Sequence, residues 1–174
     1  IEIKRLGYIG KVTNTNICLG FPREILREKF DVIHAHMPTP WSSDWSILIS
    51  RLKGKKSIIT IHNDMDKPGF FKKVITEIYL NTIFRISLFL VNKIIVVNPE
   101  WKKSFKNTRK ILESYNKKII TVPNGVDTTL FRTANKSHSE YDILFVSVLD
   151  KYHEFKGFNY LVESLKIIRK KLLK

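Results

Sequence analysis

Residues 121–127 read TVPNGVD, directly after one apolar run and ahead of a second run at residues 143–148. Pro123 removes a backbone N–H donor and Gly125 permits positive φ, so the segment is expected to turn sharply. A turn alone would explain it. Because the polar residues 133–140 and the second apolar run follow, the segment predicts a hinge between two α/β domains.

On both sides of this hinge, short runs of Ile and Val alternate with amphipathic stretches, which is typical of βα units on a parallel sheet. Each run is nearly continuous in apolar residues, as expected for a strand buried on both faces. The expected strands are Asp31–His34, Ser57–Ile61, Lys93–Val97, Lys118–Val122 and Asp142–Val148. The expected helices, from apolar spacing and flanking breakers, lie at about residues 22–29, 42–53, 70–91, 99–115 and 158–172.

The pattern divides the chain into residues 1–132 (most of an N-terminal domain), residues 133–140 (a linker) and residues 141–174 (the start of a second domain). The length of 174 residues suits one domain and part of another, and 43% apolar with 27% charged residues is typical of a globular protein. Cys18 is the single cysteine, which excludes an internal disulfide and favours a cytoplasmic setting. No secretory signal pattern is present.

Residues 74–91 are apolar enough to raise the question of a membrane span. Glu77, Asn81 and Arg85 recur at four-residue spacing, so their polar groups share one helix face. A charge near the centre of a span costs about 2.5–3.5 kcal/mol. The segment is therefore expected to pack against the sheet, and a helix lying in a membrane interface is the alternative.

The net charge of +15 is concentrated in the middle of the chain, where residues 71–134 carry 12 basic and 4 acidic side chains. The basic residues of segment 99–118 could attract anionic lipid headgroups, nucleic acid or a phosphorylated substrate. A solvated helix face in a lysine-rich protein is the simpler interpretation. No nucleic-acid motif accompanies these residues, so no nucleic acid partner is expected.

Three histidines are expected at one edge of the sheet. His34 and His36 lie at the end of one predicted strand, and His62 follows the next. Ligands of open parallel sheets bind beyond the carboxyl ends of the strands, so these imidazoles share a candidate site. His34 and His36 are two residues apart and would lie on one face. A zinc site with three histidine nitrogens is one alternative, and histidines that cap strand ends through hydrogen bonds are another.

Two further segments carry candidate chemistry. Asp64-Met65-Asp66 spells a weak metal-binding triplet, which we interpret as loop carboxylates that accept hydrogen bonds from a hydroxylated acceptor. Lys156-Gly157 opens the last predicted helix. A lysine beside the unpaired N–H groups of a helix N-terminus suits a diphosphate.

In order, these motifs resemble the retaining "group 1" glycosyltransferases (glycosyltransferase family four), which have the GT-B fold. The matching segments are Phe30–His36, Thr60–His62, Lys93–Val97, Val122–Asp127 with Phe131, and Ile143–Val146 leading to Lys156-Gly157. Each motif is weak alone, but their shared order and spacing make the likeness specific. The resemblance implies two Rossmann-like domains, of which the chain would hold most of the first and the first βα unit of the second.

The resemblance also implies roles for individual residues. In that family the N-terminal domain holds the acceptor, the C-terminal domain holds the nucleoside diphosphate sugar, and no metal is required. The roles that follow by position are catalytic for His62; acceptor-binding for His34, His36, Asn63 and Asp64; hinge and cleft for Asn124, Gly125 and Asp127; and donor-phosphate binding for Lys156 and Gly157.

The chain also departs from the family pattern. Ser147-Val148 stands where the family usually has Gly-Arg, although a subgroup with Val-Leu-Asp resembles Val148–Asp150 more closely. The family's glycine-rich first loop would precede Ile1 and its paired glutamates would follow Lys174, so a truncated and inactive piece is expected.

The implied partners are a nucleotide-sugar donor and a sugar or lipid-linked acceptor. Peripheral contact with an anionic membrane at the inner, cytoplasmic face is expected to accompany a lipid acceptor. The rival hypothesis is a basic α/β module that attaches to anionic membrane or nucleic acid without catalysis, through residues 99–118.

Overall fold

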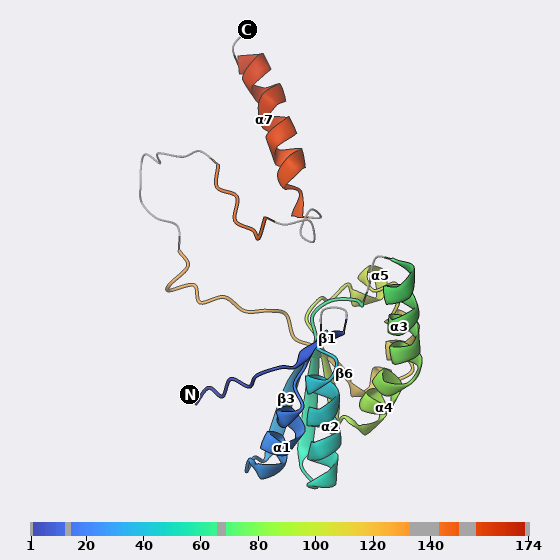
Figure 1. Cartoon of the computed structure of the whole chain (residues 1–174). Coiled ribbons are helices and arrows are strands. Elements are labelled where there is room, and N and C mark those ends of the chain that lie inside the picture. Colours follow the sequence, from blue (N-terminus) through green and yellow to red (C-terminus); the bar gives the residue numbers. More distant parts are fainter. Residues whose placement is uncertain (1, 13–14, 66–68, 133–142, 150–155, 173–174) are drawn as a thin grey trace. The chain divides into compact units, whose positions relative to one another are not determined.

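The computed structural model describes residues 2–12, 15–65, 69–132, 143–149 and 156–172 (Figure 1). The chain divides into two compact units, Ile1–Val126 and Asp127–Lys174. The expected linker at residues 133–140 lies outside the described residues.

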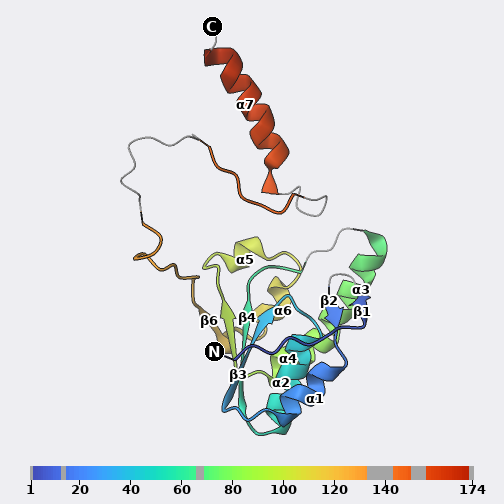
Figure 2. The same ribbon diagram turned by 60° about the vertical axis from the view of Figure 1, so that its left-hand side comes forward.

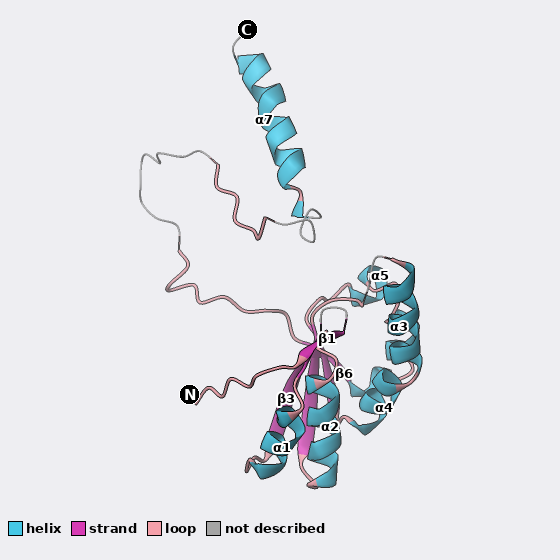
Figure 3. Ribbon diagram, in the orientation of Figure 1, coloured by secondary structure: helices cyan, strands magenta, loops and turns pink. Residues whose placement is uncertain are grey.

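The first unit alternates strands and helices along the chain (Figure 3). It starts with an antiparallel hairpin that the sequence analysis did not predict, and a series of βα units follows. The elements are β1 (Gly10–Val12), β2 (Thr15–Ile17), α1 (Gly20–Arg27), β3 (Val32–Met37), α2 (Ser42–Leu52), β4 (Lys56–Ile61), α3 (Phe70–Asn81), α4 (Ile83–Leu90), β5 (Lys93–Val96), α5 (Trp101–Ser104), α6 (Arg109–Glu113), the 3₁₀ helix η1 (Asn116–Lys118) and β6 (Ile119–Thr121).

Strands β3 to β6 form one parallel sheet in the order β3-β4-β5-β6, so the predicted α/β class is confirmed. Each strand pairs with the next one along the chain, and helices make the crossovers that parallel pairing requires. In the register of β3 on β4, His34 lies opposite Ile58 and His36 opposite Thr60. This register brings the ends of β3 and β4 to the same edge.

One face of the sheet carries the core. Helices α2 and α4 pack against this face, and Figures 1 and 2 show them on the same side of the sheet. The strand residues that point toward these helices are fully buried: Ile59, Ile61, Ile94 and Val96. On the opposite face Val32 and Ile120 are 51% and 44% exposed. Because side chains alternate along a strand, His34 and His36 belong to this more open face.

Two predicted helices are interrupted. The expected helix at 70–91 is two helices that meet at Thr82, whose φ of −121° and ψ of −92° are not helical. The expected helix at 99–115 is replaced by α5, α6 and η1. The carboxylate of Asp64 accepts the backbone N–H groups of residues 106–108, which a continuous helix would have bonded internally.

Two lysines close the C-terminal ends of helices. Lys118 Nζ donates to the carbonyl oxygens of Leu88, Phe89 and Val91 at the end of α4, at 3.0, 2.6 and 2.8 Å. Lys53 does the same for α1. An ammonium group at this position satisfies unpaired carbonyls and interacts favourably with the helix dipole. These contacts join the end of α1 to the end of α2 and the end of α4 to η1.

The second unit corrects one prediction. Its helix α7 (Phe158–Leu172) has the predicted bounds. The expected strand at Asp142–Val148 is wrong for the described residues 143–149, which form no strand. A strand is stable only when a neighbour completes its hydrogen-bond ladder, and the described part of this unit contains no other strand.

Candidate functional site: three stacked histidines

The three histidines come together at the carboxyl edge of β3 and β4. His34 and His36 point to one face of β3, and His62 directly follows β4. The ring centroids of His34 and His36 are 4.5 Å apart, and those of His36 and His62 are 5.2 Å apart. The geometry therefore forms one continuous stack of imidazoles at the edge where ligands of parallel sheets bind.

Hydrogen bonds fix the orientation of the stack. His36 Nδ1 and His62 Nε2 are 2.9 Å apart, and His34 Nε2 lies 2.7 Å from Thr60 Oγ1. The carbonyl oxygen of His36 accepts a hydrogen bond from the Ser43 hydroxyl at 3.0 Å. The contacts of the ring nitrogens with Thr60 and with each other orient the imidazoles, and Nδ1 of His62 and Nε2 of His36 are left for a ligand.

The environment of His34 disfavours its protonation. Burial, followed by the positive charges that His36 and His62 would carry, lowers the pKa of His34. In the contact between His36 and His62 one ring nitrogen donates a hydrogen bond and the other accepts it. An imidazole nitrogen that accepts hydrogen bonds can also accept a proton from an approaching hydroxyl group.

The stability of the fold is expected to depend on pH through His34. Because the pKa of His34 is lower in the folded state, the unfolded chain binds more protons as the pH falls below the ordinary histidine value of about 6.5. The free energy of unfolding is therefore expected to decrease between pH 7.5 and pH 5, and to decrease less in His34→Gln. Urea unfolding of both proteins at the two pH values measures this, and identical losses would contradict the shift.

The arrangement does not resemble a metal centre. Within residues 2–12, 15–65, 69–132, 143–149 and 156–172, no group of three His, Cys, Asp or Glu side chains is arranged to hold a metal ion. The rings of His36 and His62 are stacked with 19° between their planes and bond to each other. Their nitrogens face one another instead of converging on a common point.

Asn63 and Asp64 follow His62 directly. Asn63 is exposed, whereas Asp64 is drawn into the protein and its oxygens accept hydrogen bonds from Asn107 N, Thr108 N and the Thr108 hydroxyl. Burial alone would raise the pKa of Asp64, but these hydrogen bonds, with one from Lys106 N, lower it overall. Asp64 therefore fixes the loop beside His62, and Asn63 is the neighbour that remains open to a ligand.

The segment around Asn124 is extended. Val122 N donates to Val96 O at 3.1 Å, which continues the ladder of β6, and residues 122–127 contain no turn. Gly125 does not adopt the positive φ that the sequence suggested. The turn comes later, where Asp127 Oδ1 accepts hydrogen bonds from Thr129 N and Leu130 N. These bonds, with that of the Thr129 hydroxyl, lower the pKa of Asp127.

Lys156 and Gly157 lie at the N-terminus of α7, in the second unit. Gly157 has a φ of 84°, which explains the glycine, and its carbonyl accepts Leu161 N at 3.0 Å. Lys156 is exposed. The predicted combination of a lysine and a helix N-terminus is therefore present within this unit.

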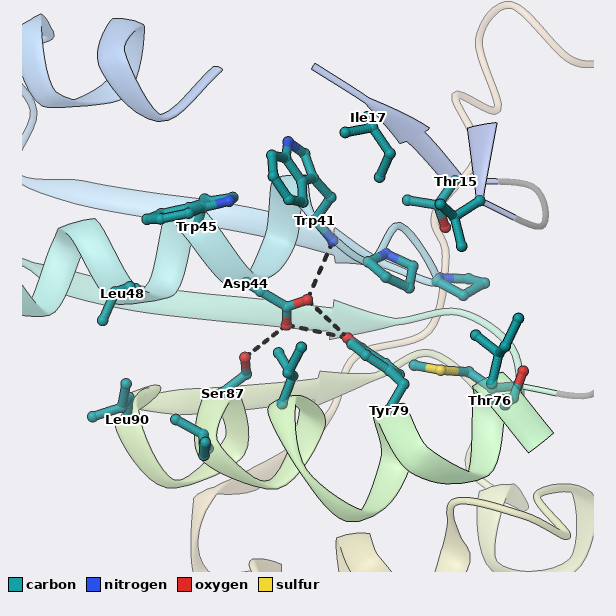
Figure 4. A pocket seen from close by; sticks show the side chains of 17 residues that line it. Thr15, Ile17, Trp41, Asp44, Trp45, Leu48, Thr76, Tyr79, Ser87 and Leu90 are labelled. Carbon is teal, nitrogen blue, oxygen red and sulfur yellow. Dashed lines mark hydrogen bonds between the residues drawn. The ribbon is translucent and has the colours of Figure 1, made fainter. Parts of the chain in front are cut away.

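Sequence reasoning missed a half-buried carboxylate in the first unit. The carboxylate of Asp44 accepts hydrogen bonds from Trp41 N, the Tyr79 hydroxyl and the Ser87 hydroxyl, at 3.2, 3.1 and 2.6 Å (Figure 4). Burial raises the pKa of Asp44 although these hydrogen bonds lower it. The one hint in the sequence was that Asp44 lies within the helix predicted at about residues 42–53, since an aspartate that packs inward from a helix needs hydrogen-bond partners.

Comparisons with known proteins agree with the motif order. A family model described as Glycosyltransferase Family 4 matches residues 14–130. The chain is 30% identical over 148 residues to one of the subunits of phosphatidylinositol N-acetylglucosaminyltransferase from Arabidopsis thaliana, and the alignment covers 84% of this chain and 31% of that protein. The chain thus spans about a third of the length of this curated relative. No solved structure matches significantly.

Proposed function

The chain belongs to glycosyltransferase family 4, and from this we propose that it supplies the acceptor side of an enzyme that moves a sugar from a nucleoside diphosphate sugar to an acceptor hydroxyl with retention. The observation that carries the proposal is the stack of His34, His36 and His62 at the carboxyl edge of the sheet. A neutral imidazole there can orient a hydroxyl group and relieve it of a proton.

In this proposal His62 contacts the reacting groups, and His34, His36 and Asn63 line the acceptor side. The hinge between the acceptor side and the donor side is formed by Asn124, Gly125 and Asp127. Lys156 and Gly157 bind the donor diphosphate, since departure of the nucleotide develops negative charge that a fixed cation and helix N–H groups stabilise. No metal is needed for this step, because the ammonium group takes that electrostatic role.

The name of the relative indicates the acceptor class. That protein is named for transfer of N-acetylglucosamine to phosphatidylinositol. We extend this to a glycolipid pathway in which the acceptor is a phosphoinositol lipid, so that the enzyme works as a peripheral protein on the cytoplasmic face of a membrane. None of the described helices is long and apolar enough to cross a bilayer.

The transfer assay that tests the proposal uses a complete family 4 enzyme containing this chain, a labelled nucleoside diphosphate sugar and vesicles with phosphatidylinositol. Label in the lipid fraction is expected. The 174-residue chain alone is expected to be inactive, because its described second unit contains one helix and no strand to surround a nucleotide. A complete enzyme that labels no lipid or sugar acceptor would contradict the proposal.

Lys156→Ala is the second prediction. In the complete enzyme, this change is expected to lower kcat by more than about tenfold, because the transition state loses a cation beside the departing phosphate. The change Lys166→Ala, further along α7, serves as a matched control and should leave kcat unchanged. Equal rates for Lys156→Ala and the unmodified enzyme would exclude the phosphate role.

A further inference from the structure

A pocket of about 450 Å³ lies between the β1–β2 hairpin and helices α2, α3 and α4 (Figure 4). None of the three histidines lines it. Its walls are mainly apolar and include Ile17, Trp45, Leu48, Ile75, Ile83 and Ile86. The volume falls in the range of small-molecule sites, so the pocket is large enough for a ligand of its own.

The charged group of this pocket is already paired. The Asp44 carboxylate accepts hydrogen bonds from Tyr79, Ser87 and the backbone of Trp41, as Figure 4 shows. A ligand that used this carboxylate would have to break these hydrogen bonds, whereas a hydrocarbon would leave them intact. Most of the other lining side chains are apolar. The chemistry of the walls therefore selects an apolar chain.

The pocket opens onto an apolar stripe on the outer face of α3 and α4. Phe71, Ile78 and Phe89 are 81%, 60% and 71% exposed, far more than is usual for such large apolar side chains on a helix. Ile75 and Ile86 belong to both surfaces, because they line the pocket and are themselves about half exposed. The stripe and the pocket are thus continuous.

The charges on these helices fit an anionic surface. Lys73 and Arg85 are exposed on α3 and α4, against the single acidic residue Glu77. Helices with exposed Phe and Ile and with basic neighbours lie in membrane interfaces and prefer anionic lipids. A protein partner could cover the stripe, but it would leave the adjoining pocket unexplained.

We propose that the stripe on α3 and α4 docks on an anionic bilayer and that the pocket beside Asp44 receives one hydrocarbon chain of a membrane lipid. This rests on the proposed function in so far as a lipid acceptor brings the enzyme to a membrane. Its tests need neither donor nor sugar transfer, so the two proposals can fail separately.

Tryptophan fluorescence tests the pocket. Vesicles of phosphatidylcholine and phosphatidylserine with brominated acyl chains quench only tryptophans that approach the bromine atoms. Trp41 and Trp45 line the pocket, whereas Trp101 is 4% exposed in the core and does not. Quenching is expected in the 174-residue chain and in Trp101→Phe, and it should be lost in Trp41→Phe/Trp45→Phe. Vesicle-bound protein without quenching would overturn the pocket assignment.

Vesicle binding tests the stripe. Phe71→Ser/Phe89→Ser is expected to weaken binding by at least about tenfold, since two exposed apolar anchors are lost. Leu26→Ser/Leu52→Ser is the matched control, because its residues are 52% and 71% exposed on α1 and α2, outside the stripe. Equal effects of the two double changes, or no binding to anionic vesicles at all, would overturn the membrane surface.

Two further changes test the pocket and the charges separately. Leu48→Phe places a bulkier side chain in the pocket without adding a tryptophan, so vesicle binding should persist while quenching of Trp41 and Trp45 decreases. Lys73→Gln/Arg85→Gln should remove the preference for phosphatidylserine over pure phosphatidylcholine. Undiminished quenching in Leu48→Phe would contradict the pocket, and an unchanged lipid preference would contradict the charge argument.

Discussion

Replacing His62 with alanine is expected to lower the rate of sugar transfer by at least about a hundredfold in a complete family 4 enzyme that contains this chain. His62 follows β4 directly, and its Nε2 is held by His36 Nδ1 at 2.9 Å. This contact leaves Nδ1 of the ring for a substrate hydroxyl. Removal of the imidazole therefore removes a group that was already oriented for the reaction.

His34→Gln is the matched control for this experiment. The side chain of His34 bonds to Thr60 at the inner end of the stack, and a glutamine amide can keep that hydrogen bond. Its effect on kcat should stay below about tenfold. The measurement is the steady-state rate of both variants, and thermal unfolding shows that each variant is folded. An unchanged rate for His62→Ala would remove His62 from the reaction.

Asp44→Ala is expected to lower the free energy of unfolding by about 3 kcal/mol or more. The change leaves the hydroxyls of Tyr79 and Ser87 and the N–H of Trp41 without their acceptor. Trp41 has a φ of 75°, which is strained for a residue other than glycine, and the bond to Asp44 helps to hold it.

Urea unfolding of the chain measures this effect. Glu113→Ala is the control, because Glu113 is a half-exposed carboxylate paired with Arg109 at 3.9 Å, and exposed pairs contribute at most about 1 kcal/mol. Asp44→Asn should fall between the two, since the amide oxygen accepts hydrogen bonds and the NH₂ group does not. A loss below about 1 kcal/mol for Asp44→Ala would contradict the network.

The sheet could be predicted because each of its strands is indicated by a short run of neighbouring residues in the sequence. The strands β4, β5 and β6 consist mainly of β-branched residues, and β3 begins with Val32 and Ile33. The order of these strands along the chain is their order in the sheet. The convergence of His34, His36 and His62 followed from the same pattern, since parallel strands end at a common edge.

Features that depend on distant residues could not be read from local patterns. The interruption of the helix expected at 99–115 depends on Asp64, which lies more than 40 residues earlier and takes the N–H groups of residues 106–108. The break at Thr82 and the pocket likewise arise from how α2, α3 and α4 pack together. The strand expected at Asp142–Val148 is absent from the described residues 143–149, because a strand needs a neighbouring strand, which apolar periodicity along the chain does not reveal.

The central claim is that the stacked histidines form the acceptor side of a sugar-transfer site. Nuclear magnetic resonance of the imidazole groups in the 174-residue chain, titrated with inositol 1-phosphate as the soluble headgroup, tests it most directly. The signals of His36 and His62 are expected to shift saturably, and the shifts should vanish in His62→Ala. If the imidazole signals stay fixed while only lysines of segment 99–118 respond, the ligand binds the basic surface and the claim is contradicted.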